Sequence, residues 1–246
     1  MPKAPRVDLD AFDVISFDCY GTLIDWESGI LAAMQPVLVR HELVSSASEV
    51  LRAYARAESA VEAGAYRPYR EVLRRTFAAM AKDLGFAPQA GELETFVEAL
   101  ASWPPFPDTV RSLRALAGAG CRLAVVSNID EDLFEDSARA LQVEFEFVIT
   151  AASVGAYKPD PAVFEAALAR MGLQPGRLLH VAQSRYHDIA SARRLGIQTV
   201  HVERDAGRDG ASATPELDEQ AEPDLSVPDL ASFVRALGLE PSGGRT

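Results

Sequence analysis

Cysteine is scarce in this sequence. The 246 residues include only Cys19 and Cys121, and both fall in apolar stretches. Two isolated thiols do not make the dense disulfide framework of a small secreted protein, so we expect both to be small core residues. The protein must therefore depend on an ordinary hydrophobic core, which its 48% hydrophobic content can supply.

Basic residues and long apolar runs are also lacking. Lys and Arg number 24 against 36 Asp and Glu, a formal net charge of −12. Nucleic-acid binding needs clustered Lys and Arg, so we expect no such partner. No run approaches the roughly 18 apolar residues of a membrane span, so we expect no membrane partner. The opening residues MPKAPRVDLDAFD lack the apolar region of a secretory signal, and we expect a cytoplasmic protein.

Short runs that are apolar at consecutive positions and rich in β-branched residues predict the strands. They cover residues 14–17, 123–126, 145–150, 178–182 and 199–202. Continuous apolarity is typical of strands buried on both faces, as in a parallel sheet. Stretches of helical periodicity lie between them, at residues 109–117, 131–141, 161–171 and 188–195. This alternation predicts an α/β fold with a doubly wound, Rossmann-like parallel sheet.

One interval has no strand pattern. Helical patterns fill it, at residues 30–40, 49–63, 69–84 and 93–102. We interpret residues 26–101 as a helical cap domain inserted into a core domain of residues 1–25 and 102–240, with a ligand pocket between the two. Residues 204–223 are expected to form a mobile loop, residues 227–237 a terminal helix, and residues 241–246 a disordered tail.

Polar residues follow the first two predicted strands. Ligands of an open α/β sheet bind outside the carboxyl ends of its strands, where these residues fall. Asp18 ends the first strand and can act as a carboxylate nucleophile, or it can cap the turn made by Gly21 and Thr22. Ser127 and Asn128 follow the second strand and can bind an anion or cap the next helix.

Further polar residues follow the later strands. Lys158 can keep a nearby carboxylate ionised, although most lysines are simply solvated. Asp188 can orient water, pair with Lys158 or stabilise a helix N-terminus, and His187 beside it is a general base or a surface residue. The order Asp, Ser-Asn, Lys-Pro, Asp at successive strand ends is more specific than any one of these residues.

These groups resemble the motifs of the haloacid dehalogenase superfamily of hydrolases. FDCYGTLID, VVSNID, YKPDP and AQSRYHD look like its first to fourth motifs, and the helical insert looks like its cap domain. The resemblance covers about residues 12–202. It implies that Asp18 is the nucleophile, Ser127 and Asn128 contact nucleophile or substrate, Lys158 balances charge, and Asp188 completes the site.

The chain departs from the phosphatases of that superfamily at two positions. Those enzymes carry a second Asp two residues after the nucleophile, where this chain has Tyr20, and tend to have a metal-binding acid at the position of Gln183. Mg²⁺ prefers carboxylate ligands, so we expect no metal site and no cofactor, with Mg²⁺ required only by a phosphatase. The Tyr20 pattern looks like the 2-haloacid dehalogenase branch, whose chemistry needs neither metal nor a leaving-group acid.

That branch implies hydrolysis of a small 2-substituted carboxylic acid of the (S)-2-haloacid type. Asp18 would displace halide from C2, and water would hydrolyse the aspartyl ester. The cap arginine of those dehalogenases is missing, since Ala60 lies near its position, and Arg56, Arg67 or Arg70 could replace it. The substrate-binding residues expected on this basis are Tyr20, Thr22, Arg67, Asn128, Tyr186 and His187.

Other functions stay open. FDCYGTLIDWE, WPPFPDTV, SNID, VGAYKP and YHD look like a subgroup that includes an azetidine-2-carboxylate hydrolase, where a C–N bond breaks and Tyr186 or His187 could donate a proton. A Mg²⁺-dependent phosphatase and a non-catalytic binding protein are the remaining alternatives. Beyond a small carboxylic acid and water, the expected partner is a second copy in a homodimer.

Overall fold

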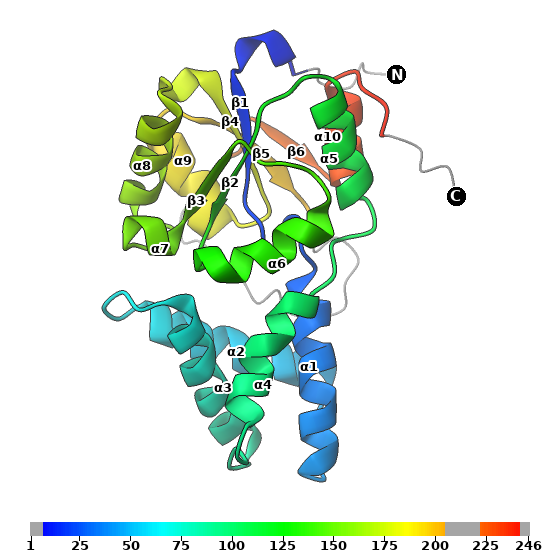
Figure 1. Cartoon of the computed structure of the whole chain (residues 1–246), viewed down its shortest axis with the longest axis vertical. Coiled ribbons are helices and arrows are strands. Elements are labelled where there is room, and N and C mark those ends of the chain that lie inside the picture. The colour runs from blue at the N-terminus through cyan, green and yellow to red at the C-terminus, as the bar shows by residue number, and fades with distance from the viewer. Residues whose placement is uncertain (1–6, 205–221, 242–246) are drawn as a thin grey trace.

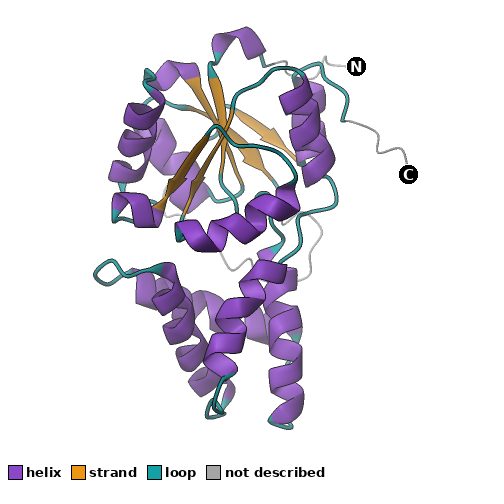
Figure 2. Ribbon diagram, in the orientation of Figure 1, coloured by secondary structure: helices purple, strands orange, loops and turns teal. Residues whose placement is uncertain are grey.

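A parallel sheet forms the centre of the protein (Figures 1 and 2). The structure is a computed structural model that describes residues 7–204 and 222–241. Within them the strand order is β3-β2-β1-β4-β5-β6, which confirms the doubly wound α/β fold. The strands are β1 (Val14–Phe17), β2 (Leu123–Ser127), β3 (Phe147–Thr150), β4 (Leu178–Ala182), β5 (Gln198–Val202) and β6 (Leu225–Val227).

Helices cover both faces of the sheet because each strand alternates its side chains between them. Phe17 of β1 packs in one apolar cluster with Leu116 and Phe134, whereas Val14 packs in a second cluster with Phe164. The first cluster lies under α5 (Thr109–Gly118), α6 (Glu131–Leu141) and α10 (Leu230–Ala236). The second lies under α8 (Pro161–Met171) and α9 (Ala190–Arg194), with the short α7 (Ala151–Val154) nearby.

The helices that follow β1 stand beyond the carboxyl edge of the sheet (Figure 1). Tyr54, Phe77 and Phe96 are buried among them, so these helices pack on one another through their own apolar sides. They are α1 (Trp26–Arg40), α2 (Ala47–Glu62), α3 (Tyr69–Leu84) and α4 (Glu92–Glu98). Short turns complete the described elements: η1 (Leu9–Ala11), η2 (Ala99–Ser102), η3 (Pro175–Arg177) and η4 (Arg185–Ile189).

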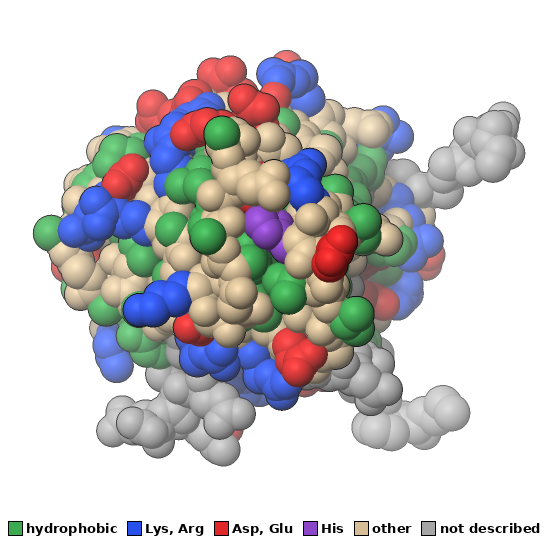
Figure 3. Space-filling model, turned by 90° about the horizontal axis from the view of Figure 1, so that it is seen from below, with side chains coloured by type: hydrophobic (Ala, Val, Ile, Leu, Met, Phe, Trp, Pro, Cys, Tyr) green, Lys and Arg blue, Asp and Glu red, His purple; other side chains and the backbone are tan. Residues whose placement is uncertain are grey.

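The surface at the helical end carries charges of both signs. Seen from that end, basic and acidic side chains are interspersed with apolar ones (Figure 3). Several are paired, such as Arg74 with Glu94 and Arg70 with Asp132. None of the helices in residues 7–204 and 222–241 is long and apolar enough to cross a bilayer.

Some predicted elements differ from the observed ones. Residues 225–227 form edge strand β6, so the expected terminal helix starts only at Leu230. The expected helix over residues 188–195 is preceded by one π-helical turn, η4, and α9 starts at Ala190. The expected loop at 204–223 and tail at 241–246 lie almost wholly outside the described residues.

Candidate active site

A cavity of about 330 Å³ opens at the carboxyl ends of the strands, where α1 and α2 face the sheet. The strands β2 and β3 lie on one side of β1, and β4, which follows β3 in the chain, lies on the other side. The strand order therefore reverses beside β1, and such a point is where doubly wound sheets bind ligands. The predicted residues Asp18, Ser127, Asn128, Lys158 and Asp188 all line this cavity. The structure therefore brings the separate sequence motifs together, while their catalytic roles stay predictions.

Asp18 reaches the cavity because β1 ends in a sharp turn. Gly21 has φ +93°, a conformation that side-chain-bearing residues rarely adopt. A Cβ there would lie 3.2 Å from Trp26 Nε1 and 3.4 Å from Gln183 Oε1, so glycine also lets these side chains approach. The turn leaves Asp18 only 7% exposed.

Lys158 joins the two catalytic carboxylates that the sequence predicted. Its Nζ donates to Asp18 Oδ1 at 2.8 Å, to Asp188 Oδ1 at 2.5 Å and to the Val126 carbonyl at 2.9 Å. All three protons of the ammonium therefore have an acceptor, as a buried charge requires. One buried cation between two carboxylates leaves this group of three with a formal charge of −1.

Burial and ion pairing shift the pKa values of Asp18, Asp188 and Lys158 in opposite directions. Burial raises the pKa of Asp18, against the lowering effect of the Lys158 charge. Burial also acts to raise the pKa of Asp188, but Lys158 and His180 outweigh it and lower the value to about 2. Burial tends to lower the pKa of Lys158, yet the two carboxylates raise it above its usual value. Lys158 is therefore a fixed cation at neutral pH.

Thr22 holds the other oxygen of Asp18. Its hydroxyl donates to Asp18 Oδ2 at 2.8 Å and accepts from the Gln183 amide at 2.9 Å. Thr22 is fully buried and is not among the residues that line the cavity. The side chain of Thr22 orients Asp18, and the structure does not bring it to the cavity, where a substrate-binding residue was expected.

We predict that Thr22→Val destabilises the protein by about 1–3 kcal/mol, since two buried polar groups lose their partner. The turnover number should fall as well, because Asp18 Oδ2 is no longer fixed. Urea unfolding and steady-state kinetics measure the two effects. Thr22→Ser keeps the hydroxyl and should recover most of both; equal loss in the Ser variant would contradict this role.

A buried hydrogen-bond chain continues behind Asp188. His180 Nε2 lies 2.9 Å from Asp188 Oδ1, and His180 Nδ1 lies 2.8 Å from Ser16 Oγ. Both His180 and Ser16 are fully buried, in β4 and β1. His180 was not predicted from the sequence, although a single histidine inside the apolar run LLHVA was a signal that could have identified it.

Ser127 and Asn128 have different surroundings. Ser127 is 1% exposed, and its Oγ has no hydrogen-bond partner among the described residues. The Asn128 side chain instead binds the Lys158 backbone, donating to its carbonyl at 3.1 Å and accepting from its amide at 2.7 Å. Asn128 thus positions the lysine, whereas the Ser127 hydroxyl makes no hydrogen bond to the described residues.

The remaining predicted substrate-binding residues fall into two groups. Tyr20, Tyr186 and His187 line the cavity. The Tyr20 hydroxyl is 2.9 Å from Ser137 Oγ, and burial raises its pKa well above the usual value. Burial lowers the pKa of His187 to about 4, so this imidazole is neutral at pH 7.

Arg67 was expected to bind the substrate, but the structure does not bring its side chain to the cavity. Its guanidinium donates to the Ala65 carbonyl at 2.8 Å. The alternatives Arg56 and Arg70 pair with Asp83 and Asp132 outside the cavity. The position of a side chain in a helix or loop relative to a distant strand depends on packing, which spacing along the chain does not reveal.

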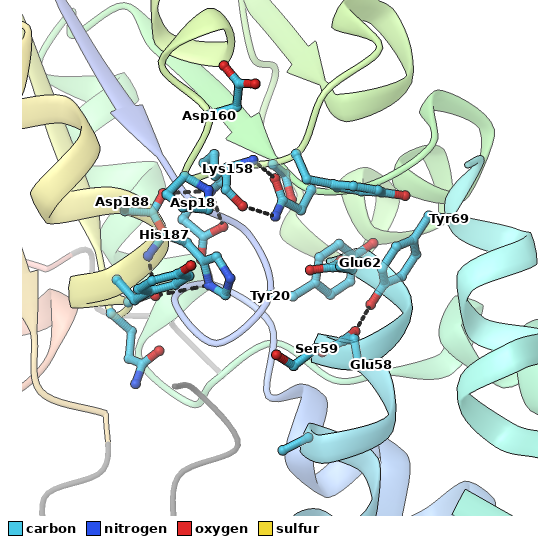
Figure 4. Close-up of a pocket in the computed structure, with 18 of the residues that line it drawn as sticks. Asp18, Tyr20, Glu58, Ser59, Glu62, Tyr69, Lys158, Asp160, His187 and Asp188 are labelled. Atoms are coloured by element: carbon cyan, nitrogen blue, oxygen red, sulfur yellow. Dashed lines mark hydrogen bonds and ion pairs between the residues drawn. The ribbon is translucent and has the colours of Figure 1, made fainter. Parts of the chain in front are cut away.

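The wall opposite Asp18 comes from α2 and the start of α3 (Figure 4). Glu58 and Glu62 are four residues apart, so they share one face of α2, and both line the cavity with Tyr69. Asp130 accepts from the amides of Tyr69 and Arg70 at 2.8 and 3.0 Å, which caps α3 from the core. Glu58, Glu62 and Asp130 were not predicted from the sequence.

The haloacid dehalogenase-like hydrolase family matches residues 12–196. The chain belongs to this family. Its motif resemblance is thereby confirmed, and the protein is a hydrolase of the haloacid dehalogenase type. This haloacid dehalogenase-like hydrolase places its four motif groups around one cavity, as described above.

Relatives of this haloacid dehalogenase-like hydrolase include both branches considered from the sequence. It is 30% identical to (S)-2-haloacid dehalogenase H-109 of Pseudomonas putida, over 82% of this chain and 90% of that enzyme. It is 32% identical to phosphoserine phosphatase of Thermus thermophilus, over 70% of this chain but only 66% of that enzyme. A crystal structure of an L-2-haloacid dehalogenase superposes with TM-score 0.72 at 26% identity, covering 92% of this chain and 99% of that one.

Proposed function

We propose that this hydrolase displaces a substituent from C2 of a small carboxylic acid through an ester on Asp18. The observation that carries this proposal is the pair of hydrogen bonds that the Asp18 carboxylate accepts at the cavity. Lys158 and Thr22 donate to its two oxygens, which favours the anion that a nucleophile must be. Halogen is the substituent in the similar dehalogenase of Pseudomonas putida, and an amine is the alternative.

The proposed reaction has two steps. A carboxylate oxygen of Asp18 bonds to C2 from the side opposite the leaving group, which departs with the bonding electrons and leaves C2 inverted. Water then adds to the carboxyl carbon of the Asp18 ester and releases the 2-hydroxy acid. The Lys158 ammonium stabilises the negative charge that develops on the ester oxygen. Asp188, with its low pKa, is a weak base and serves to hold Lys158 and orient water.

We propose that the reaction needs no divalent cation. Asp18 and Asp188 each already accept from the Lys158 ammonium, whose charge repels a second cation between them. Tyr20 and Gln183 contribute no negative charge where phosphatases carry acids. The Tyr20 hydroxyl is bound to Ser137 and keeps its proton, which also makes it a poor acid for a leaving alcohol.

Labelled water tests this proposal. In single-turnover reactions in H₂¹⁸O, with enzyme in excess over (S)-2-chloropropionate or L-azetidine-2-carboxylate, the peptide that contains Asp18 should gain one heavy oxygen. A phosphatase would not label Asp18, because water attacks phosphorus in that reaction. Turnover of p-nitrophenyl phosphate that EDTA abolishes, with an unlabelled Asp18, would favour the phosphatase suggested by the Thermus thermophilus relative.

A further inference from the structure

His180 contacts Asp188 from within the sheet. Its ring Nε2 lies 2.9 Å from Asp188 Oδ1, the same oxygen to which the Lys158 ammonium donates at 2.5 Å. His180 is fully buried in β4 and does not line the cavity, so a ligand in the cavity does not reach it. Any effect of His180 on the reaction must therefore pass through Asp188.

The partner of the other ring nitrogen decides where the imidazole carries its proton. Ser16 Oγ lies 2.8 Å from His180 Nδ1, and the register of the sheet places Ser16 opposite His180. The Ser16 hydroxyl can donate to Nδ1, which leaves the ring proton on Nε2, facing the Asp188 carboxylate. The opposite tautomer would turn a lone pair toward an anion. His180 therefore donates from Nε2 to Asp188 Oδ1.

The packing around the imidazole holds it in one position. The edge of one ring meets the face of the other where His180 contacts Phe164 of α8, with ring centroids 4.8 Å apart. Thr199 of β5 lies opposite His180 on the other side of β4. Phe164, Thr199 and Ser16 are all fully buried. A side chain packed on every side keeps its rotamer, so His180 is a fixed donor.

Asp188 itself belongs to a less regular element. It lies on η4, the π-helical turn between β4 and α9. Such turns are rare and occur mostly at functional sites. Two donors meet at its Oδ1: the Lys158 ammonium, which comes from the loop before α8, and the His180 N–H, which comes from the sheet. The carboxylate is therefore held from two directions.

Formation of the proposed ester changes the charges around Lys158. Before attack, the ammonium lies between the carboxylates of Asp18 and Asp188 (Figure 4). Esterification removes the negative charge of Asp18, so Asp188 becomes the only anion of this group of three, and Lys158 is attracted to it alone. Asp188 must still orient water at the Asp18 carboxyl carbon. A second, immobile donor prevents the carboxylate from following the ammonium.

We propose that His180 is a positioning residue for the second step of the reaction, hydrolysis of the ester on Asp18. It holds Asp188 in place after the charge of Asp18 has been lost. The proposal rests on the proposed function, because it assumes that this ester forms. Burial acts to raise the pKa of Asp188, but the Lys158 charge and the hydrogen bond from His180 lower it to about 2. The same hydrogen bond thus also keeps Asp188 ionised.

The step in which His180 acts is the hydrolysis of an ester. The water oxygen bonds to the carboxyl carbon of Asp18, and the bond between that carbon and the product oxygen breaks. One water proton ends on the product hydroxyl, the other passes to solvent, and Asp18 returns as a carboxylate. Asp188 accepts a hydrogen bond from the water and keeps its charge. His180 keeps its proton and acts only through the position of Asp188.

Kinetics that resolve the two steps test this role. Rapid quenching and mass spectrometry of the Asp18 peptide follow the ester formed from (S)-2-chloropropionate or L-azetidine-2-carboxylate. His180→Phe keeps a ring against Phe164 but removes a hydrogen bond to a charged group, so ester hydrolysis should slow about tenfold or more while ester formation changes less than about threefold. The ester should therefore accumulate. His180→Gln retains an N–H donor and should restore most of the hydrolysis rate.

Two further variants separate positioning from stability. His180→Phe leaves Ser16 Oγ without its histidine partner, and adding Ser16→Ala removes that buried hydroxyl. Stability should then recover in part, while ester hydrolysis stays slow. His41→Phe is the matched control: His41 also contacts a buried carboxylate, Glu92, at 3.1 Å, but it follows the last residue of α1 and does not line the cavity. This variant should slow neither step.

The outcomes distinguish this role from the proposed function. Equal slowing of the two steps, or fast ester hydrolysis in a folded His180→Phe protein, would overturn the role of His180 and leave Asp18 as the nucleophile. If His180→Phe does not fold, Ser16→Ala decides, because loss of the donor to Nδ1 should slow hydrolysis about threefold; an unchanged rate would contradict the role. If neither compound forms an ester on Asp18 or labels it with heavy oxygen, the proposed function is wrong, and the role of His180 with it.

Discussion

Turnover is expected to be lost in Asp18→Asn, by about 10⁴-fold or more, because an amide oxygen is a far weaker nucleophile than a carboxylate. The fold should survive the substitution. Lys158 keeps Asp188 as its partner at 2.5 Å, so one cation and one anion stay buried together. Steady-state assays with the substrates named above measure the loss, and thermal unfolding checks the fold.

The control for this prediction is a variant that keeps a carboxylate at position 18. Asp18→Glu retains the charge but moves it by one methylene, so it should also be nearly inactive if attack requires the position that Lys158 and Thr22 define. Substantial activity in a folded Asp18→Asn protein, measured after mass spectrometry has excluded deamidation to Asp, would contradict the nucleophilic role.

Lys158→Met is expected to have the largest effect on stability. The side chain is 1% exposed and lies between two carboxylates, so its removal leaves two buried negative charges without a cation. Removing one partner of a buried ion pair typically costs about 3–5 kcal/mol, and activity should be lost as well. Urea unfolding measures the change in the free energy of unfolding, and the wild type is the reference.

A double variant separates charge from packing in this prediction. Lys158→Met with Asp188→Asn leaves one buried carboxylate, Asp18, which still accepts from Thr22 at 2.8 Å. Most of the lost stability should return, although activity should not. If the double variant were as unstable as the single one, lost packing of the lysine chain would explain the effect better than unpaired charge.

Sequence patterns predicted the sheet well where strands are buried on both faces. β1 and β4 have the bounds expected from their apolar runs, and β2 ends one residue later than expected. β6 was missed because an edge strand of three residues has too short a pattern to recognise. The π-helical turn η4 was missed as well, since the residues before α9 have ordinary helical periodicity.

The residues of the candidate site also divide into those that the sequence predicted and those that it did not. Asp18, Ser127 and Asp188 were found because the carboxyl ends of parallel strands meet at one edge, so order along the chain implies nearness in space. Arg67 was selected from the helical insert by position alone, and its side chain turned out to lie outside the cavity. Glu62 was overlooked, since one acid on an exposed-looking helix carries no local signal.

The amino-acid sequence by itself determined the α/β class, the motif residues at the strand ends and the presence of a helical insert. These depend on local periodicity and on the regular geometry of a parallel sheet, which leave a pattern in consecutive residues. Only the tertiary structure decided which face of α2 looks across the cavity at Asp18, and hence that Glu58 and Glu62 line the cavity. The reason is physical: the orientation of the helices follows from the packing of many side chains, including the Asp130 cap on α3, and no short stretch of sequence contains it.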